Sequence, residues 1–544
     1  MTDRHHLTRR GLLTAGAGTA AGAALLLTGC DAPRAIRATN IGKKLAEWPD
    51  YVPAKAPKPD FPGNDAKGIQ SAYLTYPTDL VTAVPEKPGN GETVTVALVT
   101  NEPVPPPLGR NTMWRAVNEA LGVNLKLNFI PSASLSQKLA VMMASGDVPD
   151  IITCSDGVPT FEDFIATDLQ DLTDHLSGSA IRDYPNLANL PTYSWQGVGL
   201  INGGIYGVPI QRPLPTPEMI CNLDAFDKVG GLSDWTPDQF TQRMKALTGK
   251  KHWASGPVGK TDVDRHAGWR GAPNSWVLDS SGGFHPTEAT AVYKDALAYI
   301  QKLVKDGVFY PDQVATPEAK TLMYGQTLYS MADTLPAYAT NVAAVGSRFR
   351  FDFGRPYTIP GVTPKKWDGP GWVNYTVLKK GTPSRIKLML RILNFLASPF
   401  GSKEYELIRF GVEGKHFTRD SHGQIQLSKL SQVENFNTLP LQYVCSPPLV
   451  AYFPGQPDAA RRVWNYQTET SKYLVKNPSV GLRTAAKDRY GTVTGQILND
   501  AATNIVNGRA SVKSWDDALK EWRKQGGDKI AASLREEYAA VHGH

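Results

Sequence analysis

The alternation of strand and helix patterns over residues 93–153 limits the fold more than any other feature of this chain. Residues 93–100 are a β-branched run, and residues 123–130 alternate apolar and polar side chains with the period of two of a strand. The expected order is a strand at 93–100, a helix around 114–121, a strand at 123–130, a helix at 134–144 and a strand at 150–153. This order predicts a parallel α/β sheet.

Beyond Pro209 the pattern changes to helices separated by loops rich in Gly, Pro and Trp. Thr236 followed by Pro237 is a typical helix start, and residues 287–307 form the clearest amphipathic helix. Helices are expected at 224–230, 237–247, 287–307, 385–397, 403–410, 459–475 and 515–524, and strands at 327–331 and 372–378. With 544 residues the chain exceeds one core, so two lobes are expected.

Residues 1–29 are interpreted as an export signal that takes no part in the fold. Arg9 and Arg10 precede an apolar stretch that is too weakly apolar to cross a membrane, which is typical of a twin-arginine signal. The stretch ends in Leu-Thr-Gly-Cys at Cys30, which resembles the lipobox of bacterial lipoproteins. We therefore expect export by the twin-arginine or Sec route and a lipid on Cys30 that holds the protein at the outer face of the cell membrane. The alternative is an ordinary buried cysteine after an apolar helix.

Residues 30–91 are studded with proline, which removes backbone donors and prevents regular helix or sheet. The first part is expected to be a stiff tether, and the later part, around 72–76, carries enough apolar mass to lie against the folded body.

Composition and motifs exclude several classes of function. The charged fraction is 20% and no Lys/Arg-rich block is present, which argues against nucleic-acid binding. Cys154, Cys221 and Cys445 lie in apolar or small surroundings without a C-x-x-C arrangement, so core positions are expected rather than a metal or redox site. Residues 254–261 miss a P-loop because Ala254 replaces its first glycine and no apolar strand precedes it. No metal, cofactor or catalytic residue is expected.

Six stretches in a fixed order carry a resemblance to a known family. They are 143–152 (MASGDVPDII), 205–209 (IYGVP), 222–240 (NLDAFDKVG followed by WTPDQF), 303–312 (LVKDGVFYPD), 410–416 (FGVEGKH) and 515–528 (from WDDA to WRKQGGD). Together they resemble the family 1 extracellular solute-binding proteins of bacterial ABC importers, in particular the long, LipO-like lipoprotein branch. The resemblance covers about residues 91–540.

The resemblance implies a two-lobed fold of the periplasmic-binding-protein type II, with mixed or parallel sheets flanked by helices and a hinge between discontinuous lobes. The expected division is a signal at 1–29, a tether and wrapping segment at 30–91, lobe 1 at 92–209 and 333–384, and lobe 2 at 210–332 and 385–544. It also implies a monomer that passes its solute unchanged to ABC permease subunits.

A carbohydrate, most simply an oligosaccharide, is the expected solute, because sugars are held by aromatic faces combined with short polar side chains. Asn101 and Glu102 follow the first strand, Asp156 follows the third, and Arg212 follows the crossover at Pro209. The alternatives are caps or turn residues for the first three and a salt bridge within one lobe for Arg212.

The aromatic candidates lie in loop-like sequence. Trp269 and Trp276 sit in a Gly/Pro-rich stretch with no strand or helix pattern to bury them. Asp333 and Tyr338 lie near an expected lobe crossing, and Trp372 follows Gly-Pro-Gly.

Two other functions are compatible with the anchor. A lipoprotein glycoside hydrolase would need only two carboxylates about 5–9.5 Å apart, and Asp156, Asp279 and Asp333 are candidates. A surface adhesion or signalling lipoprotein would leave the α/β cleft unexplained. The order of binding-protein motifs disfavours both.

Overall fold

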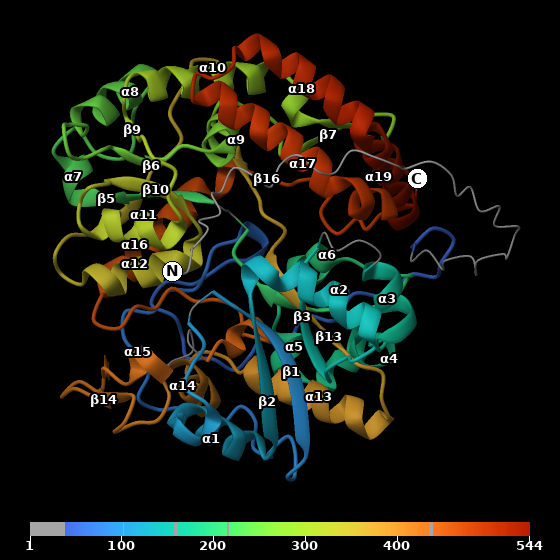
Figure 1. Ribbon diagram of the computed structural model, residues 1–544. Helices are drawn as coiled ribbons and strands as arrows, with labels where there is room; N and C mark the ends of the chain where they lie inside the picture. Colours follow the sequence, from blue (N-terminus) through green and yellow to red (C-terminus); the bar gives the residue numbers. More distant parts are fainter. Residues whose placement is uncertain (1–38, 102, 157–160, 215–216, 435–438, 544) are drawn as a thin grey trace, which may run out of the picture. The chain divides into compact units, whose positions relative to one another are not determined.

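The computed structural model describes residues 39–543 except 102, 157–160, 215–216 and 435–438 (Figure 1). These residues belong to one compact unit, residues 37–544. The predicted export signal and Cys30 lie outside the described residues.

A five-stranded sheet organises the first region of this unit. Its strand order is β2-β1-β3-β13-β4. The strands are β1 (Thr93–Thr100), β2 (Asn124–Pro131), β3 (Ile151–Cys154), β4 (Val208–Gln211) and β13 (Trp372–Leu378). β1 is parallel to β2 and β3, whereas β13 is antiparallel to β3 and β4. The predicted strand–helix alternation is therefore confirmed, with one antiparallel strand inserted from far along the chain.

Local chemistry sets the ends of the two helices that connect β1, β2 and β3. In α1 (Thr112–Leu121) the Asn111 side chain accepts a hydrogen bond from the Trp114 amide, and Gly122 ends the helix with a φ of 67°. α2 (Leu135–Ser145) ends in the same way at Gly146, with a φ of 68°. Only glycine adopts this left-handed geometry without strain.

The two faces of the sheet bury alternate residues of the same strands. Val94, Val96 and Leu98 face a core that includes α13 (Pro383–Leu396) and α14 (Lys403–Phe410). Ala97 and Val99 face a core formed with α2, α3 (Phe161–Asp168) and α6 (Thr192–Val198). The short helices α4 (Thr173–Leu176) and α5 (Pro185–Ala188), and α15 (Ser431–Glu434), complete this region. A sheet covered on both faces is typical of α/β proteins.

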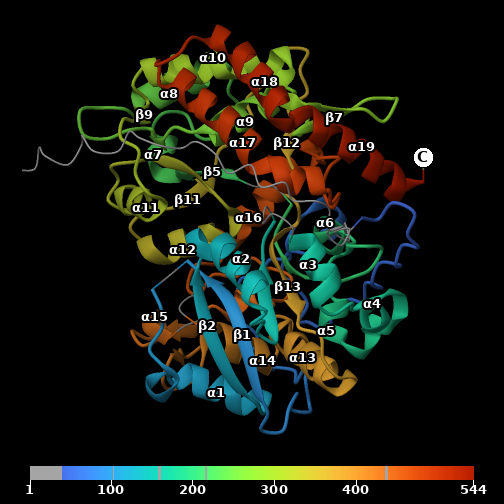
Figure 2. The same ribbon diagram turned by 45° about the vertical axis from the view of Figure 1, so that its right-hand side comes forward.

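A second, three-stranded sheet organises the other region. It is antiparallel, with the order β10-β5-β11, and its strands are β5 (Glu218–Asn222), β10 (Ser330–Asp333) and β11 (Phe351–Phe353). Its helices are α7 (Leu223–Asp227), α8 (Pro237–Ala246), α9 (Lys260–Trp269), α10 (Ala291–Lys305), α11 (Thr316–Tyr324), α12 (Leu335–Val345), α16 (Pro457–Thr470), α17 (Ala485–Val506), α18 (Trp515–Trp522) and α19 (Asp528–His542). Their buried faces form the remaining large cores, and Figure 2 shows α8–α10 and α17–α19 gathered together.

Four two-stranded ladders complete the described strands. They are β12 (Lys366–Trp367) with β16 (Leu474–Val475), β6 (Ser255–Pro257) with β9 (Phe309–Tyr310), β7 (Trp276–Leu278) with β8 (Phe284–Pro286), and β14 (Phe417–Arg419) with β15 (Ile425–Leu427).

The chain divides between the two regions differently from the predicted boundaries. Residues 335–353 pack in the second region, because β11 pairs with β5. Residues 386–408 and 439–445 pack on the first sheet, because α13 follows β13 after a short loop. The predicted lobe boundary at residue 333 therefore lies within the second region, and the one at residue 385 lies within the first region.

Residues 39–84, which we call the strap, contact both regions. The Val52 amide of the strap donates to the Ala188 carbonyl of the first region, and the Phe61 ring packs at a tilt against Trp464 of the second region, with ring centroids 5.1 Å apart. Its only described helical turn is η1 (Asp65–Lys67). Because proline interrupts the strap, it adds isolated bridges such as Ala72–Ala451 instead of a ladder.

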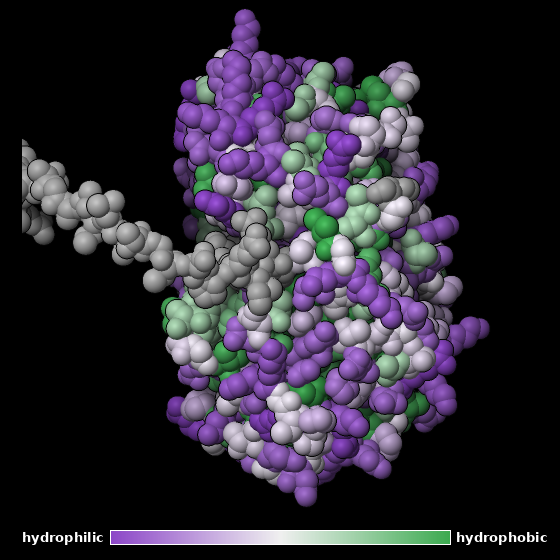
Figure 3. All heavy atoms as spheres, turned by 90° about the vertical axis from the view of Figure 1, so that its right-hand side faces the viewer, coloured by the Kyte–Doolittle hydropathy of each residue, from purple (hydrophilic) through white to green (hydrophobic). Residues whose placement is uncertain are grey.

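The surface and the cysteines complete the description of the fold. On the face seen in Figure 3, hydrophilic side chains prevail and hydrophobic ones form small patches. Within the described residues, no helix combines the length and apolarity that membrane crossing requires. Cys154, Cys221 and Cys445 are buried and unpaired, as expected for core positions.

Candidate functional site: the crossing segments at the sheet edge

The carboxyl ends of β1, β3 and β4 and the start of β13 lie at one edge of the five-stranded sheet. We call this the carboxyl edge. Four sequence-predicted residues lie there, namely Asn101, Asp156, Arg212 and Trp372. Open α/β sheets bind ligands at this edge, because the loops that follow the strands converge there. Glu102, predicted beside Asn101, lies outside the described residues.

Residues 211–218 and 354–372 pass between the two regions at this edge, and residues 474–484, which join α16 to α17 of the second region, lie against them. We call these three stretches the crossing segments. Backbone hydrogen bonds tie them together: the Arg212 amide donates to the Gly371 carbonyl at 3.0 Å, and the Asp368 amide donates to the Val475 carbonyl at 3.0 Å. The crossing segments therefore form one hydrogen-bonded junction.

The second region contributes Asn274 to this junction. Its buried Nδ2 donates to the carbonyls of Asp368 and Val475, each at 2.8 Å. Trp276 follows closely as the first residue of β7, half-buried, with its ring 6.0 Å from Phe284 and 6.1 Å from Trp522. The expectation that no strand would hold Trp276 is wrong, although its side chain remains partly exposed.

Trp269 lies in the second core. It is only 3% exposed, and its ring packs against Phe240, His266 and Tyr357. The sequence interpretation placed it in a loop, but α9 continues as far as Trp269. Trp269 is proposed from the sequence because no helix or strand pattern buries it, and the structure shows that this reason is wrong.

Asp333 and Tyr338 also belong to the second region. Asp333 ends β10 opposite Glu218, and its Oδ2 lies 3.0 Å from Lys320 Nζ. Tyr338 is fully buried in α12, where its hydroxyl donates to the Phe351 carbonyl at 2.7 Å. The chain does not cross between regions here, contrary to the expectation, because β10 leads directly into α12.

Asp156 takes part in a charged junction between the carboxyl edge and α17. Arg483 Nη1 lies 2.8 Å from Asp156 and 3.2 Å from Glu162, and Lys487 Nζ lies 3.7 Å from Asp156. Arg483 also donates from Nε to the Val198 carbonyl at 2.6 Å. These ion pairs join Asp156 and Glu162 of the first region to Arg483 and Lys487 of the second region.

Burial and neighbouring charges shift the pKa values of the Asp156 and Asp488 carboxyl groups in opposite directions. Burial opposes ionisation of Asp156, but the charges and hydrogen bonds of Arg483 and Lys487 together outweigh it and hold the pKa of that carboxyl below its ordinary value. Asp488, on the first turn of α17, has a pKa raised to about 8 by burial and by the negative charge of Glu162. Asp488 therefore holds its proton at neutral pH.

Arg212 has a different environment. Its Nη1 donates to the carbonyl of Gln211 at 2.9 Å, and its guanidinium lies 5.8 Å from the ring centroid of Tyr443. Burial lowers its pKa. Within the described part of the chain, no carboxylate forms an ion pair with it, so the alternative of a salt bridge within one lobe is not realised there.

Asp368 is a site residue that sequence reasoning missed. Burial raises the pKa of its carboxyl to about 6, and Oδ1 is buried without a hydrogen-bond partner among the described residues. Nε1 of Trp372 is likewise buried without a hydrogen-bond partner among the described residues. The only sequence signal was the Gly-Pro-Gly stretch that separates them, which marks a tightly held loop.

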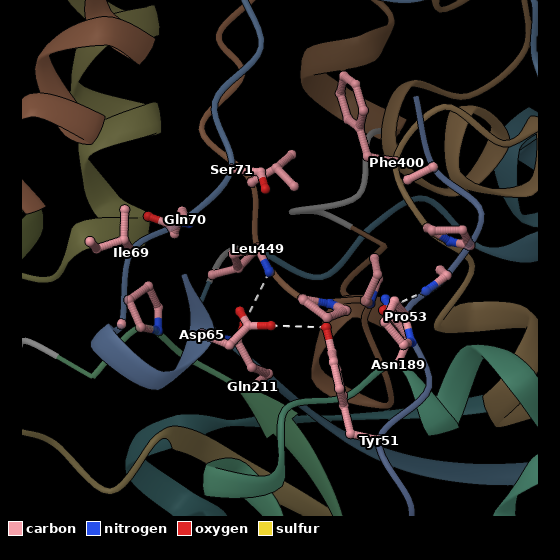
Figure 4. A pocket seen from close by; sticks show the side chains of 18 of the residues that line it. Tyr51, Pro53, Asp65, Ile69, Gln70, Ser71, Asn189, Gln211, Phe400 and Leu449 are labelled. Carbon is pink, nitrogen blue, oxygen red and sulfur yellow. Dashed lines mark hydrogen bonds between the residues drawn. The ribbon is translucent and has the colours of Figure 1, made fainter. Parts of the chain in front are cut away.

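A cavity of about 180 Å³ adjoins the junction (Figure 4). Figure 4 shows side chains from the strap and from the first region converging on it. Tyr51 donates to Asp65 at 2.9 Å, and Gln211 accepts from the Leu449 amide at 3.0 Å. Its other polar lining residues include Gln70, Ser71, Asn189 and Tyr193. The strap therefore closes a polar pocket beside the end of β4.

The described residues contain no group of three or more His, Cys, Asp or Glu side chains suited to hold a metal ion. Lys260, in the stretch that resembles a P-loop, is already paired with Asp264 at 2.8 Å and Glu288 at 3.1 Å.

Comparison with known proteins decides the family. The profile of the family described as bacterial extracellular solute-binding protein matches residues 112–398, more than half of the chain. The chain belongs to this family. The two regions described above are thus the two lobes of an extracellular solute-binding protein, the first region being lobe 1 and the second lobe 2.

Individual relatives agree over most of their length. The polygalacturonan/rhamnogalacturonan-binding protein YtcQ of Bacillus subtilis is 23% identical over 443 residues, which cover 78% of this binding protein and 87% of YtcQ. Lipoprotein LipO of the same organism is 23% identical over 464 residues, covering 79% and 89%. Among solved structures, the ABC-transporter substrate-binding protein FusA of S. pneumoniae, in complex with kestose, has a TM-score of 0.60 at 17% identity and covers 83% of this chain and 99% of its own.

Proposed function

We propose that this binding protein captures a carbohydrate between its two lobes and passes it unchanged to the permease of an ABC importer. The observation that carries the proposal is the meeting of the crossing segments with the carboxyl edge, where Trp372, Asp156 and Arg212 lie. An aromatic ring beside charged and polar side chains matches a sugar, which exposes both apolar C–H faces and hydroxyls.

The relatives support this solute class. YtcQ is named as a polygalacturonan- and rhamnogalacturonan-binding protein, and the FusA structure is a complex with kestose. We extend only the carbohydrate class to this chain, because identities of 23% and 17% leave individual contacts free to differ.

Capture would proceed by hinge closure. Two rigid lobes linked by crossing segments change their relative orientation through a few backbone dihedral angles, while each core stays intact. Ligand that contacts both lobes stabilises the closed arrangement, and no bond is made or broken.

Among the predicted residues we propose Asn101, Glu102, Asp156, Arg212 and Trp372 as ligand contacts on lobe 1. Trp276 and Asp333 are the partly exposed candidates on lobe 2. Trp269 and Tyr338 are buried in the lobe 2 cores and would act by supporting their neighbours.

Thermal melting against a panel of oligosaccharides tests the function. Ligand that binds only the folded state stabilises it by mass action, by about 2.7 kcal/mol at a ligand concentration of 100 Kd. This stabilisation raises the melting temperature. We expect one oligosaccharide class to raise it, with no new reducing ends over time. Appearance of reducing ends would instead identify a glycoside hydrolase.

We further propose that Cys30 carries the lipid anchor, that export uses the twin-arginine or Sec route, and that the mature protein is a monomer. The motif at residues 27–30 and the relative named lipoprotein LipO support the anchor. Expression of wild type and Cys30→Ser in a bacterial host tests it: wild type should fractionate with membranes and gain the mass of a lipid, and Cys30→Ser should do neither.

A further inference from the structure

Asp368 lies where all three crossing segments meet. Its amide donates to the Val475 carbonyl at 3.0 Å, and its own carbonyl accepts from Asn274 Nδ2 at 2.8 Å. The next amide, of Gly369, donates to the Leu214 carbonyl. The backbone at Asp368 is thus bonded to both other crossing segments and to lobe 2, so the hinge holds the point from which its side chain projects.

The carboxyl group of Asp368 is not satisfied by this environment. Its Oδ1 is buried and accepts no hydrogen bond from any described residue, and no described cation lies within ion-pair distance of it. Lys366 and Lys476 are the positive charges that act on it from further away, and Asp368 in turn acts electrostatically on the Tyr193 hydroxyl of α6, which is hydrogen-bonded to Gln211. Lys366 is itself committed to Glu218 at 2.8 Å.

Buried acceptors without a partner are unfavourable, and native proteins keep them mainly where a ligand or water completes the bonding. The loop that carries Asp368 is also held rigidly. A Cβ atom on Gly371 would lie 2.6 Å from the Tyr193 ring, and one on Gly197 would lie 1.9 Å from the Pro370 carbonyl oxygen. Glycine at both positions lets the loop pack directly on α6.

Trp372 adds an unsatisfied donor to the same loop. Its Nε1 is buried without a hydrogen-bond acceptor among the described residues. A short rigid loop therefore offers one free acceptor and one free donor, four residues apart, at the hinge.

We propose that Asp368 is a specificity-determining residue that accepts hydrogen bonds from hydroxyl groups of the bound carbohydrate, while the Trp372 indole N–H donates to a sugar oxygen. The inference rests on the proposed function and names the chemistry of one contact point within it. A carboxylate accepts from hydroxyls and repels carboxylates, so the sugar unit held by Asp368 presents hydroxyls rather than a uronate group at this point.

Isothermal calorimetry with an oligosaccharide that raises the melting temperature of wild type tests the contact. Asp368→Asn keeps the shape of the side chain but replaces one acceptor by a donor, and should weaken binding at least about tenfold. Trp372→Phe, which keeps a ring and removes the N–H, should weaken it severalfold. The matched control is the exposed Asp312→Asn, which should bind as wild type does.

The pH dependence distinguishes a ligand contact from a purely structural role. Hydrogen bonds from hydroxyls favour the ionised carboxylate, so binding lowers the Asp368 pKa from about 6 and releases a proton at lower pH. Wild-type affinity should therefore fall as the pH decreases from 6.5 to 5, and Asp368→Asn should lack this fall.

Three outcomes are distinguishable. If wild type binds no carbohydrate, the proposed function fails. If wild type binds and Asp368→Asn binds within twofold with the same pH profile, only this inference is overturned. If Asp368→Asn unfolds, Trp372→Phe decides: binding at wild-type strength by that variant overturns the inference, and a severalfold loss with an unchanged ligand-free melting temperature supports it.

Discussion

Arg483 lies 2.8 Å from Asp156 across the contact between the two lobes, although 327 residues separate them in sequence. The guanidinium is buried, lies 4.9 Å from the centroid of the Tyr375 ring, and also pairs with Glu162. One side chain from the segment before α17 thus pairs with two carboxylates on lobe 1.

Arg483→Met should destabilise the protein strongly. The substitution leaves the charges of Asp156 and Glu162 without their main partner, and removing one member of a buried ion pair costs about 3–5 kcal/mol. Urea unfolding measures the loss, with the exposed Arg535→Met as control. A loss below about 1 kcal/mol would contradict a structural role for the pair.

Asp488 should make stability depend on pH. Its pKa is raised to about 8 in the folded protein, so the native state holds a proton that the unfolded chain releases above its ordinary pKa. Stability from this group is complete at acid pH and is lost as the pH rises toward 8, with a slope of at most about 1.4 kcal/mol per pH unit. Asp488→Asn should flatten the decline of the melting temperature between pH 5.5 and 8, and an unchanged decline would show that other groups cause it.

Lys366 and Glu218 form a buried pair at 2.8 Å inside lobe 2, and Lys366 Nζ also lies 2.7 Å from the Tyr466 hydroxyl. Lys366→Met alone should cost about 3–5 kcal/mol because it strands the Glu218 carboxylate, whereas the double variant Lys366→Met/Glu218→Gln should recover much of the loss. Chemical denaturation of wild type, both single variants and the double variant gives the coupling energy. Equal stability of the single and double variants would argue against coupling.

Trp269 and Trp276, seven residues apart, should respond differently to alanine. Trp269 is in the core, and its removal should cost about 3–5 kcal/mol. Trp276 is half-buried, so its replacement by alanine should destabilise the protein less. The loss of sugar-binding free energy in this variant should exceed its loss of unfolding free energy. Comparing unfolding free energies with calorimetric affinities separates the two effects, and equal destabilisation by both would contradict the difference in burial.

Local patterns were sufficient for much of the fold. Strand alternation and glycine helix ends predicted β1, β2 and the connecting helices, and the predicted limits of α14 and β13 match those observed. Because strand ends converge at one sheet edge, the sequence could also bring Asn101, Asp156, Arg212 and Trp372 together.

Non-local pairing accounts for what sequence could not predict. The assignment of residues 335–353 to lobe 2 depends on the pairing of β11 with β5, and more than a hundred residues separate these two strands in the sequence. α17 escaped prediction because Gly491, Gly495 and several threonines weaken its helical pattern. Asp368 could not be recognised from the sequence, because the feature that marks it is a buried carboxyl oxygen without a hydrogen-bond partner among the described residues.

The central claim is that two lobes hold a carbohydrate and release it intact. Calorimetry with the oligosaccharide that most raises the melting temperature, followed by unfolding of the complex and mass analysis of the released sugar, tests it in one series. We predict saturable one-to-one binding and recovery of the sugar at its original mass. Absence of binding by any oligosaccharide, or recovery of shorter fragments, would contradict the account.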